Sequence, residues 1–482
     1  MKNSADSMRI LRQRRPLAAA IAALFALAAP ETFAATTWVV KNCSDAQPDS
    51  LRAIVSSSAL SGDTVDLSKL GSTYSCPGNT IALTSGALTL AQSTITLSGP
   101  PTGITITGYY NGAYQNDRLI RHTGTGGTLY VRHVDFEYSR FEPAAGNAKG
   151  GCIYSAGSVN LTAVTVFQCQ ATASAAGKFA AGGGIYARAD LTMKYSLVTA
   201  NTATGVAPGY VPSGGGAYCG GNLSMSGSTI SANSAPNGNF GGLVAFGSAT
   251  ISASTISGNS SGFAGGLRVF GYGSSHTLAI TNSTISGNHS TGFVGGISAS
   301  AATTSIRNST IAFNTSASAS PDHGPGVYLF NSYPTAGHPF GVEIESSILS
   351  NNTYGGIEND FSARAAVAAN TFNLTSNNNL IRSAPGTVRP ASVTTACPLL
   401  APLRDNGGPT LTHALLSHSP AIDAGNDDAN VSEDQRGRPN SDPTNPYPYP
   451  RSSGLGPDIG AYEVQQADIV FNAGFDGCPA LF

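Results

Sequence analysis

The stretch "STISGNSSGFAGGL" at Ser254–Leu267 returns almost unchanged as "STISGNHSTGFVGGI" at Ser283–Ile297. In a globular core each segment packs against a different neighbour, so close repetition is rare. In a stack of equivalent coils each segment packs against its own equivalents, and repetition is expected. The pair of segments therefore indicates a solenoid.

The repetition extends in both directions, at a spacing that varies between about 24 and 37 residues. Each unit holds short β-branched runs broken by glycine and asparagine, and no unit shows sustained helical periodicity. Stacked units can bury an apolar face that one unit cannot. These features predict an all-β fold, a right-handed parallel β-helix whose coils lie about 4.8 Å apart.

An asparagine closes one segment of each unit, three residues after an aliphatic or β-branched position. In a β-helix these side chains would stack at a turn, where their amides can donate and accept along the axis. The alternative is a set of solvent-exposed turn residues. Both interpretations are structural. The expected ladder comprises Asn201, Asn233, Asn259, Asn288, Asn314 and Asn351.

A second, glycine-rich segment in each unit predicts which side chains face the ligand side. Alternation from Ile153 to Ile357 turns the aliphatic positions inward, and the positions between them form an outward aromatic stripe. Sugars stack on such rings and arginines hydrogen-bond their polar groups, which makes the stripe a candidate glycan site. The alternative is a stabilising stack of rings covered by long turns. The stripe comprises Tyr154, Tyr186, Arg188, Tyr218, Phe246, Arg268, Phe270, Tyr328 and Phe330.

Carboxylates are absent from the sequence between Leu191 and Ser320. A calcium-assisted lyase needs several carboxylates and a glycosidase generally needs two, so the middle of the β-helix cannot supply either site. The best candidate catalytic pair is Glu358 and Asp360, on one face of the last coil, with Asp322 and His323 one coil earlier. The alternative is a charged final coil that prevents end-to-end aggregation. An equally ambiguous group near the first coils comprises Arg132, His133, Asp135, Glu137 and Glu142.

The amino-terminal segment has the pattern of an export signal. A basic region ending at Arg14 and Arg15 precedes a short apolar run and a small-residue cleavage site near Ala34 or Ala35. We therefore expect an exported protein, extracellular or at the outer cell surface. No later stretch is long and apolar enough to span a membrane.

The chain contains 7 cysteines, which suggests disulfides in an oxidising compartment. The expected pairs are Cys43 with Cys76 and Cys397 with Cys478, while Cys219 is expected to be a buried, inert thiol. There is no CxxC motif and no zinc-type Cys/His spacing, so we expect no metal and no cofactor.

Composition supports a folded, weakly charged protein. Hydrophobic residues make up 41%, charged residues only 11%, and the net charge is −2. Nothing in this balance indicates nucleic-acid binding. We expect a monomer whose possible partner is a polysaccharide or a glycan of the cell envelope.

The two ends of the β-helix are expected to carry caps. A short helix at Leu51–Ser58 would cover the first coil, and an irregular segment rich in Asp, Arg and Gly would close the other end. The expected division is a signal peptide at 1–35, an amino-terminal cap and first coil at 36–90, a β-helix at 91–375, a capping, anchor-like segment at 376–464 and a tail at 465–482.

At these caps a resemblance to known families becomes visible. The segment "NCSDAQPDSLRAI…GDTVDLS" resembles bacterial exported β-helix proteins of the pectin-lyase-like superfamily. The segment "DNGGPTLTHALLSHSPAIDAGN…DQRGRP…PDIGAYE" resembles the choice-of-anchor Q segment that follows such helices. The resemblance implies a surface or secreted β-helix, mostly without assigned activity, and carries over no catalytic residue.

Two functions follow. The favoured one is a non-enzymatic, glycan-binding or adhesive protein that uses the aromatic stripe. The other is a polysaccharide lyase or glycoside hydrolase that acts at one end of the β-helix, at Glu358 and Asp360.

Overall fold

The computed structural model describes residues 34–205, 214–236, 238–271, 276–317, 323–386, 388–426, 431–437 and 449–465. Most of the expected signal peptide, together with Asp322 and Cys478, lies outside these residues. Thr37–Phe482 forms one compact unit, and the fold described below is the fold of that unit.

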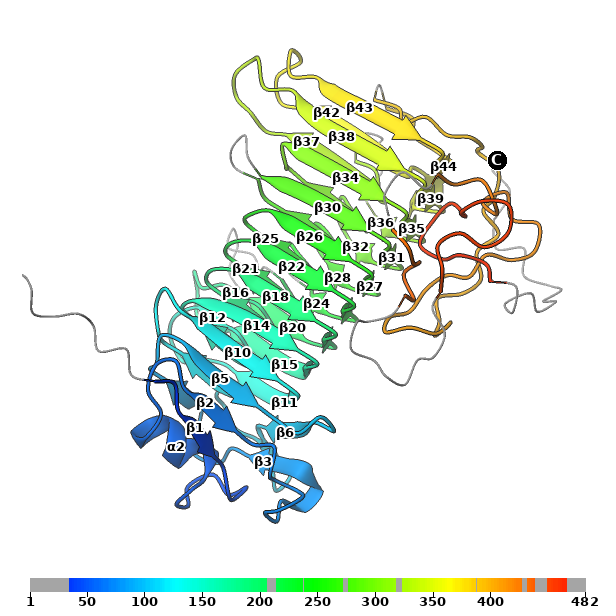
Figure 1. Ribbon diagram of the computed structural model, residues 1–482. Helices are drawn as coiled ribbons and strands as arrows, with labels where there is room; N and C mark the ends of the chain where they lie inside the picture. Colours follow the sequence, from blue (N-terminus) through cyan, green and yellow to red (C-terminus); the bar gives the residue numbers. More distant parts are fainter. Residues whose placement is uncertain are drawn as a thin grey trace, which may run out of the picture. The chain divides into compact units, whose positions relative to one another are not determined.

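Three sheets of parallel strands build a right-handed parallel β-helix, as the repeats predict. Each coil contributes one strand to each sheet before the chain rises to the next coil. The strands of the first sheet follow one another in chain order across Figure 1. They are β1 (Thr37–Val39), β2 (Thr64–Asp66), β5 (Ile95–Ser98), β10 (Thr128–Arg132), β14 (Ser158–Thr162), β18 (Leu191–Lys194), β22 (Leu223–Ser226), β26 (Ala249–Ser252), β30 (Thr277–Thr281), β34 (Thr303–Arg307), β38 (Phe340–Glu345) and β43 (Phe372–Asn377).

The second sheet has a bend within each of most coils. There the chain turns sharply after the main strand and then forms a short further strand. The main strands are β3 (Thr80–Ala82), β6 (Ile104–Thr107), β11 (Val134–Phe141), β15 (Thr165–Ala173), β19 (Leu197–Thr199), β23 (Thr229–Ser231), β27 (Thr255–Ser257), β31 (Thr284–Ser286), β35 (Thr310–Ala312), β39 (Ile348–Ser350) and β44 (Leu380–Ile381). The short strands beyond the bend are β20 (Thr202–Gly205), β24 (Ser234–Ala235), β28 (Ser260–Ser261), β32 (His289–Ser290), β36 (Thr315–Ser316) and β40 (Thr353–Tyr354), and β41 (Ile357–Glu358) pairs antiparallel with β40.

The third sheet comprises β4 (Leu88–Leu90), β9 (Ile120–His122), β13 (Ile153–Ser155), β17 (Ile185–Ala187), β21 (Ala217–Cys219), β25 (Leu243–Ala245), β29 (Leu267–Val269), β33 (Ile297–Ala299), β37 (Val327–Asn331) and β42 (Phe361–Ala365). Its aliphatic positions from Ile153 to Val327 point into the core and are fully buried. Two small pairings lie outside the three sheets: a parallel pair of β12 (Ala148–Lys149) with β16 (Ala180–Ala181), and a hairpin of β7 (Tyr109–Tyr110) with β8 (Ala113–Tyr114).

A ladder of asparagine side chains runs along the bend of the second sheet. Asn233 Nδ2 donates to Asn259 Oδ1 at 2.9 Å and to the Val198 carbonyl at 2.9 Å. Its own Oδ1 accepts from the backbone N–H and from Nδ2 of Asn201. The Asn233 amide thus uses both donors and both lone pairs, so this fully buried polar group carries no unsatisfied atom. The fully buried members are Asn201, Asn233, Asn259, Asn288, Asn314 and Asn352.

The last asparagine of the ladder is Asn352, and the prediction of Asn351 was one residue short. In every coil the residue before the ladder position is in the left-handed conformation, with φ of 53° at Ala232 and 60° at Asn351. That conformation turns the chain and directs the following side chain along the axis. Asn314 accordingly donates to Asn352, because Leu349 rather than Ile348 pairs with Ile311.

A second ladder, of serines, was not predicted. Each hydroxyl accepts from the backbone N–H of its equivalent in the preceding coil and donates to the carbonyl two residues earlier; Ser254 N–H, for example, donates to Ser283 Oγ. The serine always stands five residues before the ladder asparagine, which is a signal the sequence does contain. Its members are Ser196, Ser228, Ser254, Ser283, Ser309 and Ser347.

The ladders also explain the glycine pairs that begin the third-sheet segments. A Cβ at Gly242 would lie 3.0 Å from Asn259 Cγ and 2.5 Å from the Gly266 carbonyl oxygen. Real Cβ atoms essentially never approach a fixed atom so closely. Asparagine and glycine therefore recur together because each buried amide needs a backbone without a side chain beside it.

Both caps are present, but the carboxy-terminal one is placed differently from the expectation. Helix α2 (Leu51–Ser57) begins with Ser50 accepting from Ala53 N–H, and its buried residues pack on the first coils. At the other end, Ala384 and Val388 pack against the core of the last coil. The described parts of the chain that follows, 397–426, 431–437 and 449–465, instead run along the outer face of the second sheet, beside β31, β35 and β39 (Figure 1).

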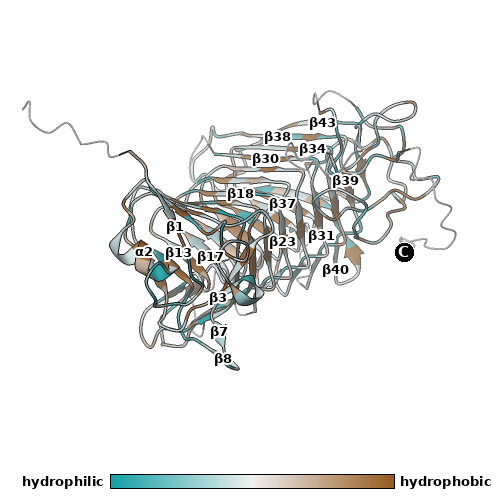
Figure 2. Cartoon of the chain, turned by 60° about the horizontal axis from the view of Figure 1, so that its bottom comes forward, coloured by the Kyte–Doolittle hydropathy of each residue, from teal (hydrophilic) through white to brown (hydrophobic). Residues whose placement is uncertain are grey.

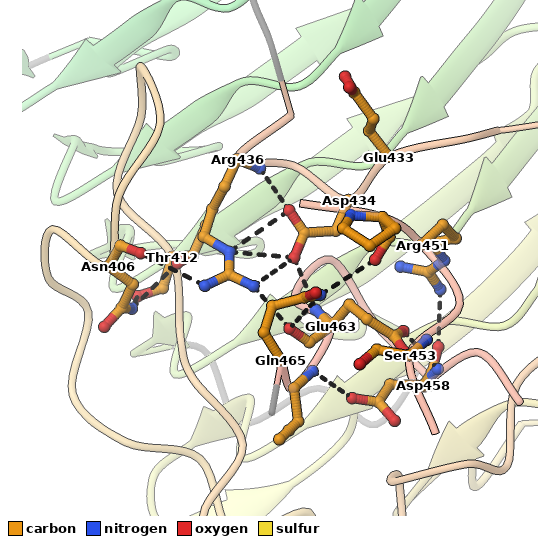
Figure 3. Close-up of polar contacts among 12 residues, drawn as sticks. Asn406, Thr412, Glu433, Asp434, Arg436, Arg451, Ser453, Asp458, Glu463 and Gln465 are labelled. Carbon is orange, nitrogen blue, oxygen red and sulfur yellow. Dashed lines mark hydrogen bonds and ion pairs between the residues drawn. The ribbon is translucent and has the colours of Figure 1, made fainter. Parts of the chain in front are cut away.

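This carboxy-terminal segment is held by buried charges. Arg436 is fully buried and pairs with Asp434 at 2.8 Å (Figure 3). Its guanidinium carbon lies 4.1 and 3.8 Å from the ring centroids of Tyr449 and Tyr462. Arg436 also donates to the Glu463 backbone carbonyl, while the Glu463 carboxylate accepts from the N–H groups of Ser453 and Asp458.

The disulfide between Cys43 and Cys76 is present as predicted. A second disulfide, between Cys152 and Cys169, was not predicted, and Cys169 occupies the ladder position one coil before Asn201. Cys397 is also disulfide-bonded. Cys219 is a buried free thiol whose pKa is raised to about 12 by burial, which makes it inert at neutral pH.

We expect Asn259→Ala to lower the free energy of unfolding by about 2–5 kcal/mol, because it leaves the Asn233 amide and the Ile230 carbonyl without their partners. Urea denaturation followed by circular dichroism measures the change. Asn160, partly exposed on β14, is the matched control, and Asn160→Ala should change stability by less than about 0.5 kcal/mol. Equal midpoints for the two variants would contradict the role assigned to the ladder.

His413 predicts that acid weakens the docking of the carboxy-terminal segment. Burial lowers its pKa to about 4, so between that value and about 6.5 the unfolded chain binds a proton that the folded chain does not. The stability contributed by the neutral ring is present above pH 6.5 and is lost as the pH falls to about 4. The loss amounts to about 3 kcal/mol at 1.36 kcal/mol per pH unit. Denaturation midpoints of wild type and His413→Asn should converge over this range, and parallel curves would refute the prediction.

Candidate functional site

The predicted aromatic stripe forms a continuous stack of rings on the outer face of the third sheet. Tyr154, Tyr186 and Tyr218 occupy the same position in successive coils. Their ring centroids lie 5.5 and 4.6 Å apart, and both pairs are parallel within 8°. Tyr218 contacts Phe246 at 5.2 Å with the ring planes tilted by 39°, and Phe246 stacks on Phe270 at 4.8 Å. One coil spacing thus separates each ring from the next.

This stacking uses the ring faces that a sugar would need. Tyr186 has a ring on each side, and its residual exposure is 7%. The first ring is covered too, because the guanidinium of Arg118 lies 5.1 Å from the Tyr154 centroid. Sugar rings bind aromatic side chains face to face, so a stack closed in this way offers them only edges.

Turn segments cover the later part of the stripe. Phe240, which is 4% exposed, packs edge-on against Phe270 at 5.5 Å, and Phe263 and Phe293 continue this cover outward. Arg268 is 7% exposed and donates to Ser298 and Ser300 hydroxyls at 2.6 and 2.9 Å. The geometry therefore matches the alternative interpretation, a stabilising stack under turns.

Two further stripe residues, Tyr328 and Phe330, belong to the same apolar cluster as Phe240, Phe246 and Phe270. Tyr328 and Phe330 lie on β37 with centroids 6.2 Å apart, and His323 packs 4.8 Å from Tyr328. Arg188 is exposed, beside Gly220 of the next coil.

The candidate catalytic carboxylates are used by the protein itself. Asp360 is fully buried, and it terminates the asparagine ladder: Oδ1 accepts from Asn352 N–H and Nδ2, and Oδ2 accepts from Ser383 N–H. A carboxylate suits this position because the last member of the ladder needs to accept only. Burial and the neighbouring Glu358 raise the pKa of Asp360, against the effect of these donors.

Glu358 is likewise engaged, in an ion pair with Arg382 at 3.0 Å in which both side chains are 6% exposed. The predicted register of the last coil was wrong here. Phe361 pairs with Val327 and fills the core, whereas Ile357 is 58% exposed in the antiparallel hairpin of β40 and β41. Glycines 355 and 356, with φ of 51° and 85°, form the turn of that hairpin and do not begin a third-sheet strand.

The three most exposed aromatic side chains among the described residues lie elsewhere, on the β7–β8 hairpin, which projects from the first coils (Figure 2). Tyr109, Tyr110 and Tyr114 are 44%, 47% and 46% exposed. Asn111 and Gly112 both have positive φ, as a two-residue type I′ turn requires. The sequence "YYNGAY" contains this signal, but it occurs once and stands outside the repeat.

The hairpin continues into an aromatic and acidic surface on the second sheet. Tyr109 lies 6.2 Å from Tyr138, which lies 5.5 Å from Phe167, measured between ring centroids. Glu137 on β11 is directly beside Phe167 on β15, and both point outward. Burial and the neighbouring Asp135 raise the pKa of Glu137. Asp135 itself accepts from Thr165 N–H at 2.6 Å.

Among the described residues no three or more His, Cys, Asp or Glu side chains are grouped to hold a metal ion. Within the same part of the chain no helix combines the length and apolar character needed to cross a bilayer.

Comparison with protein-family models gives no match. No curated protein matches the chain either. Among solved structures, the crystal structure of the pectate lyase Pel9A matches with a TM-score of 0.41 and 15% sequence identity, covering 90% of this chain and 97% of that chain. The assignment of the fold rests on the strand registers described above.

The ring stack predicts that a stacked tyrosine contributes much more to stability than an exposed one. Tyr186→Ala should lower the free energy of unfolding by about 3–5 kcal/mol, because it opens a cavity between two stacked rings. Tyr110→Ala, at an exposed position, should change it by less than about 0.5 kcal/mol. Chemical denaturation of both variants checks this, and similar losses would refute it.

Proposed function

We propose that this chain is an exported β-helix protein that binds a polysaccharide without cleaving it. The binding surface consists of the β7–β8 hairpin and the adjoining outward residues of β11 and β15, and is called the hairpin surface below. The observation that carries the proposal is the exposure of three tyrosines, each 44–47%, on one hairpin. Exposed aromatic residues gathered in one place are uncommon on a monomer without a binding role.

The arrangement of the tyrosines suits sugars. Tyr109 and Tyr114 meet edge to face, with planes 61° apart and centroids 5.1 Å apart, so they do not cover each other as the stacked rings of the third sheet do. Sugar C–H groups pack on an open ring face, and the phenol hydroxyls hydrogen-bond sugar hydroxyls. In addition, the hairpin is closed by Gln115 N–H donating to the Gly108 carbonyl, which limits the entropy lost on binding.

The charges beside the hairpin favour a neutral polysaccharide. Asp135 and Glu137 project from the same face of β11, next to Tyr138 and Phe167. Carboxylates accept hydrogen bonds from sugar hydroxyls and repel the carboxylates of acidic polymers. The glycan is therefore expected to carry hydroxyl groups and no uronate charge along the contacted stretch.

Export is supported by the disulfides Cys43–Cys76 and Cys152–Cys169, since disulfides persist in oxidising compartments. The anchor-like carboxy-terminal segment fits a protein retained at the outer surface. The alternative function, a lyase or glycosidase at the end of the β-helix, loses its support because Glu358 and Asp360 are buried in structural contacts.

Affinity electrophoresis in gels containing neutral or acidic polysaccharides tests the proposal. The mature protein should be retarded by at least one neutral polysaccharide, and the triple variant Tyr109→Ala, Tyr110→Ala, Tyr114→Ala should bind at least tenfold more weakly. Tyr130→Ala, on the outward face of β10, is the control and should bind like wild type.

Reducing ends and unsaturated products should not increase during incubation. The proposal would be contradicted if no polysaccharide retarded the wild-type protein, or if the triple variant bound with unchanged affinity.

A further inference from the structure

A serine and a histidine far apart in the sequence meet where the carboxy-terminal segment crosses the coils. Ser286, at the end of β31, and His413 lie with Oγ and Nε2 2.7 Å apart, across 127 residues of chain. The other ring nitrogen, Nδ1, lies 2.7 Å from the Ala401 carbonyl oxygen. A hydroxyl, an imidazole and a group that orients the imidazole are thus connected in series, as in an activated nucleophile.

The hydrogen bonds decide how the protons are placed. A carbonyl oxygen can only accept, so Nδ1 carries the proton and donates it to Ala401. Burial lowers the pKa of His413 to about 4 against the opposing effect of that hydrogen bond, and no charged side chain among the described residues contributes to the shift. The ring is therefore neutral near pH 7, and Nε2 accepts the hydrogen bond of the Ser286 hydroxyl.

Both side chains line a cavity. Its volume is about 350 Å³, and the rest of its wall comprises Phe313, Leu400, Ala401, Pro402 and Leu403. Ligand sites in proteins are of this size and of this mainly apolar character, with few polar groups. The cavity exists only because the carboxy-terminal segment lies against β31 and β35; the coils alone do not form it.

The pair is not one more step of the repeat. The serine at the equivalent position one coil earlier is Ser257, and the residue one coil later is Ala312. Two coils earlier, Ser231 hydrogen-bonds with Thr199 within the sheet. Within this column of described residues only Ser286 contacts a histidine, so the pairing reflects the path of the carboxy-terminal segment and not the like-on-like packing of the coils.

We propose that Ser286 is the nucleophile, and His413 the general base, of an ester-hydrolysing site. The substrate class is a carboxylic ester with a small apolar acyl group that fits the cavity beside Phe313 and Leu403. This site is separate from the hairpin surface and does not depend on glycan binding.

The chemistry requires only the ester and water. Ser286 Oγ attacks the carbonyl carbon while its proton passes to His413 Nε2. The bond from the carbonyl carbon to the alcohol oxygen breaks, and the alcohol leaves with that proton, which produces acyl-Ser286. Water then attacks the acyl carbon with His413 again accepting a proton, the bond to Oγ breaks, and the proton returns to Oγ.

The orienting group behind His413 is a carbonyl and not a carboxylate. A carboxylate would stabilise the imidazolium that forms in each step, whereas here the ring is buried and its pKa is low. Acylation by an activated ester should therefore outrun hydrolysis of the acyl-serine, so that acylated protein accumulates. An initial burst is the expected kinetic sign of such a site.

The test uses the mature protein with a fluorophosphonate probe and, separately, with p-nitrophenyl butyrate. Peptide mapping should place the probe on Ser286, and the butyrate ester should release a burst approaching one equivalent of p-nitrophenol with a matching butyryl mass on the same peptide. Labelling should be lost in Ser286→Ala and fall at least tenfold in His413→Asn. Ser257→Ala, the equivalent serine one coil earlier, should label like wild type.

Mapping on wild type keeps the test valid even if a variant folds poorly, and circular dichroism reports the folding of each variant. No labelling of folded wild type, labelling at another residue, or undiminished labelling of Ser286→Ala would overturn the proposal. The triple tyrosine variant should still be labelled, so failure of this proposal and failure of glycan binding give different results.

Discussion

The structure depends on one constraint: buried side chains at the corners of the coils must hydrogen-bond to their own equivalents in the next coil. The asparagine amides do so at 2.9 Å from coil to coil, and the serine hydroxyls form a parallel series. A left-handed residue before each position aims the side chain along the axis. Loss of register at one coil would bury unpaired donors, each of which costs about 1–3 kcal/mol. The ladders therefore hold the three sheets in step, although the loops between coils differ in length.

The same packing of equivalent residues makes aromatic rings and a carboxylate inaccessible to a ligand. Stacked tyrosines from Tyr154 to Tyr218 occupy one another's faces, and the carboxylate of Asp360 closes the asparagine ladder. Repetition brings equivalent residues together, but their ring faces and hydrogen-bonding atoms are then occupied by one another. Both proposed functions accordingly use features that occur once: the tyrosine hairpin of β7 and β8, and the contact between Ser286 and His413.

The carboxy-terminal segment contributes more than a closed end. It covers outward threonines of the second sheet, such as Thr284, which donates to Gln435 at 2.6 Å. Its own buried ions, Arg436 and Asp434, pair with each other within the segment, and the Arg436 guanidinium lies over the rings of Tyr449 and Tyr462. Because a buried ion pair is costly to desolvate unless fully hydrogen-bonded, this network specifies one conformation of an otherwise irregular chain. That conformation places His413 against the coil and completes the lining of the apolar cavity.

The sequence alone determined the repeat, the parallel β-helix, the inward aliphatic positions from Ile153 to Val327, the helical cap and the Cys43–Cys76 disulfide. Each of these follows from local alternation, spacing or compartment, which a single chain displays. It placed Asn351 and Ile357 wrongly because register is decided by which neighbour, Leu349 or Phe361, fills the core of the adjacent coil. Only the tertiary structure decided whether the rings of the aromatic stripe were open or stacked on one another. The same holds for Glu358 and Asp360, which are engaged in buried structural contacts. The tertiary structure alone brought together Ser286 and His413, since a contact across 127 residues leaves no local pattern in the chain.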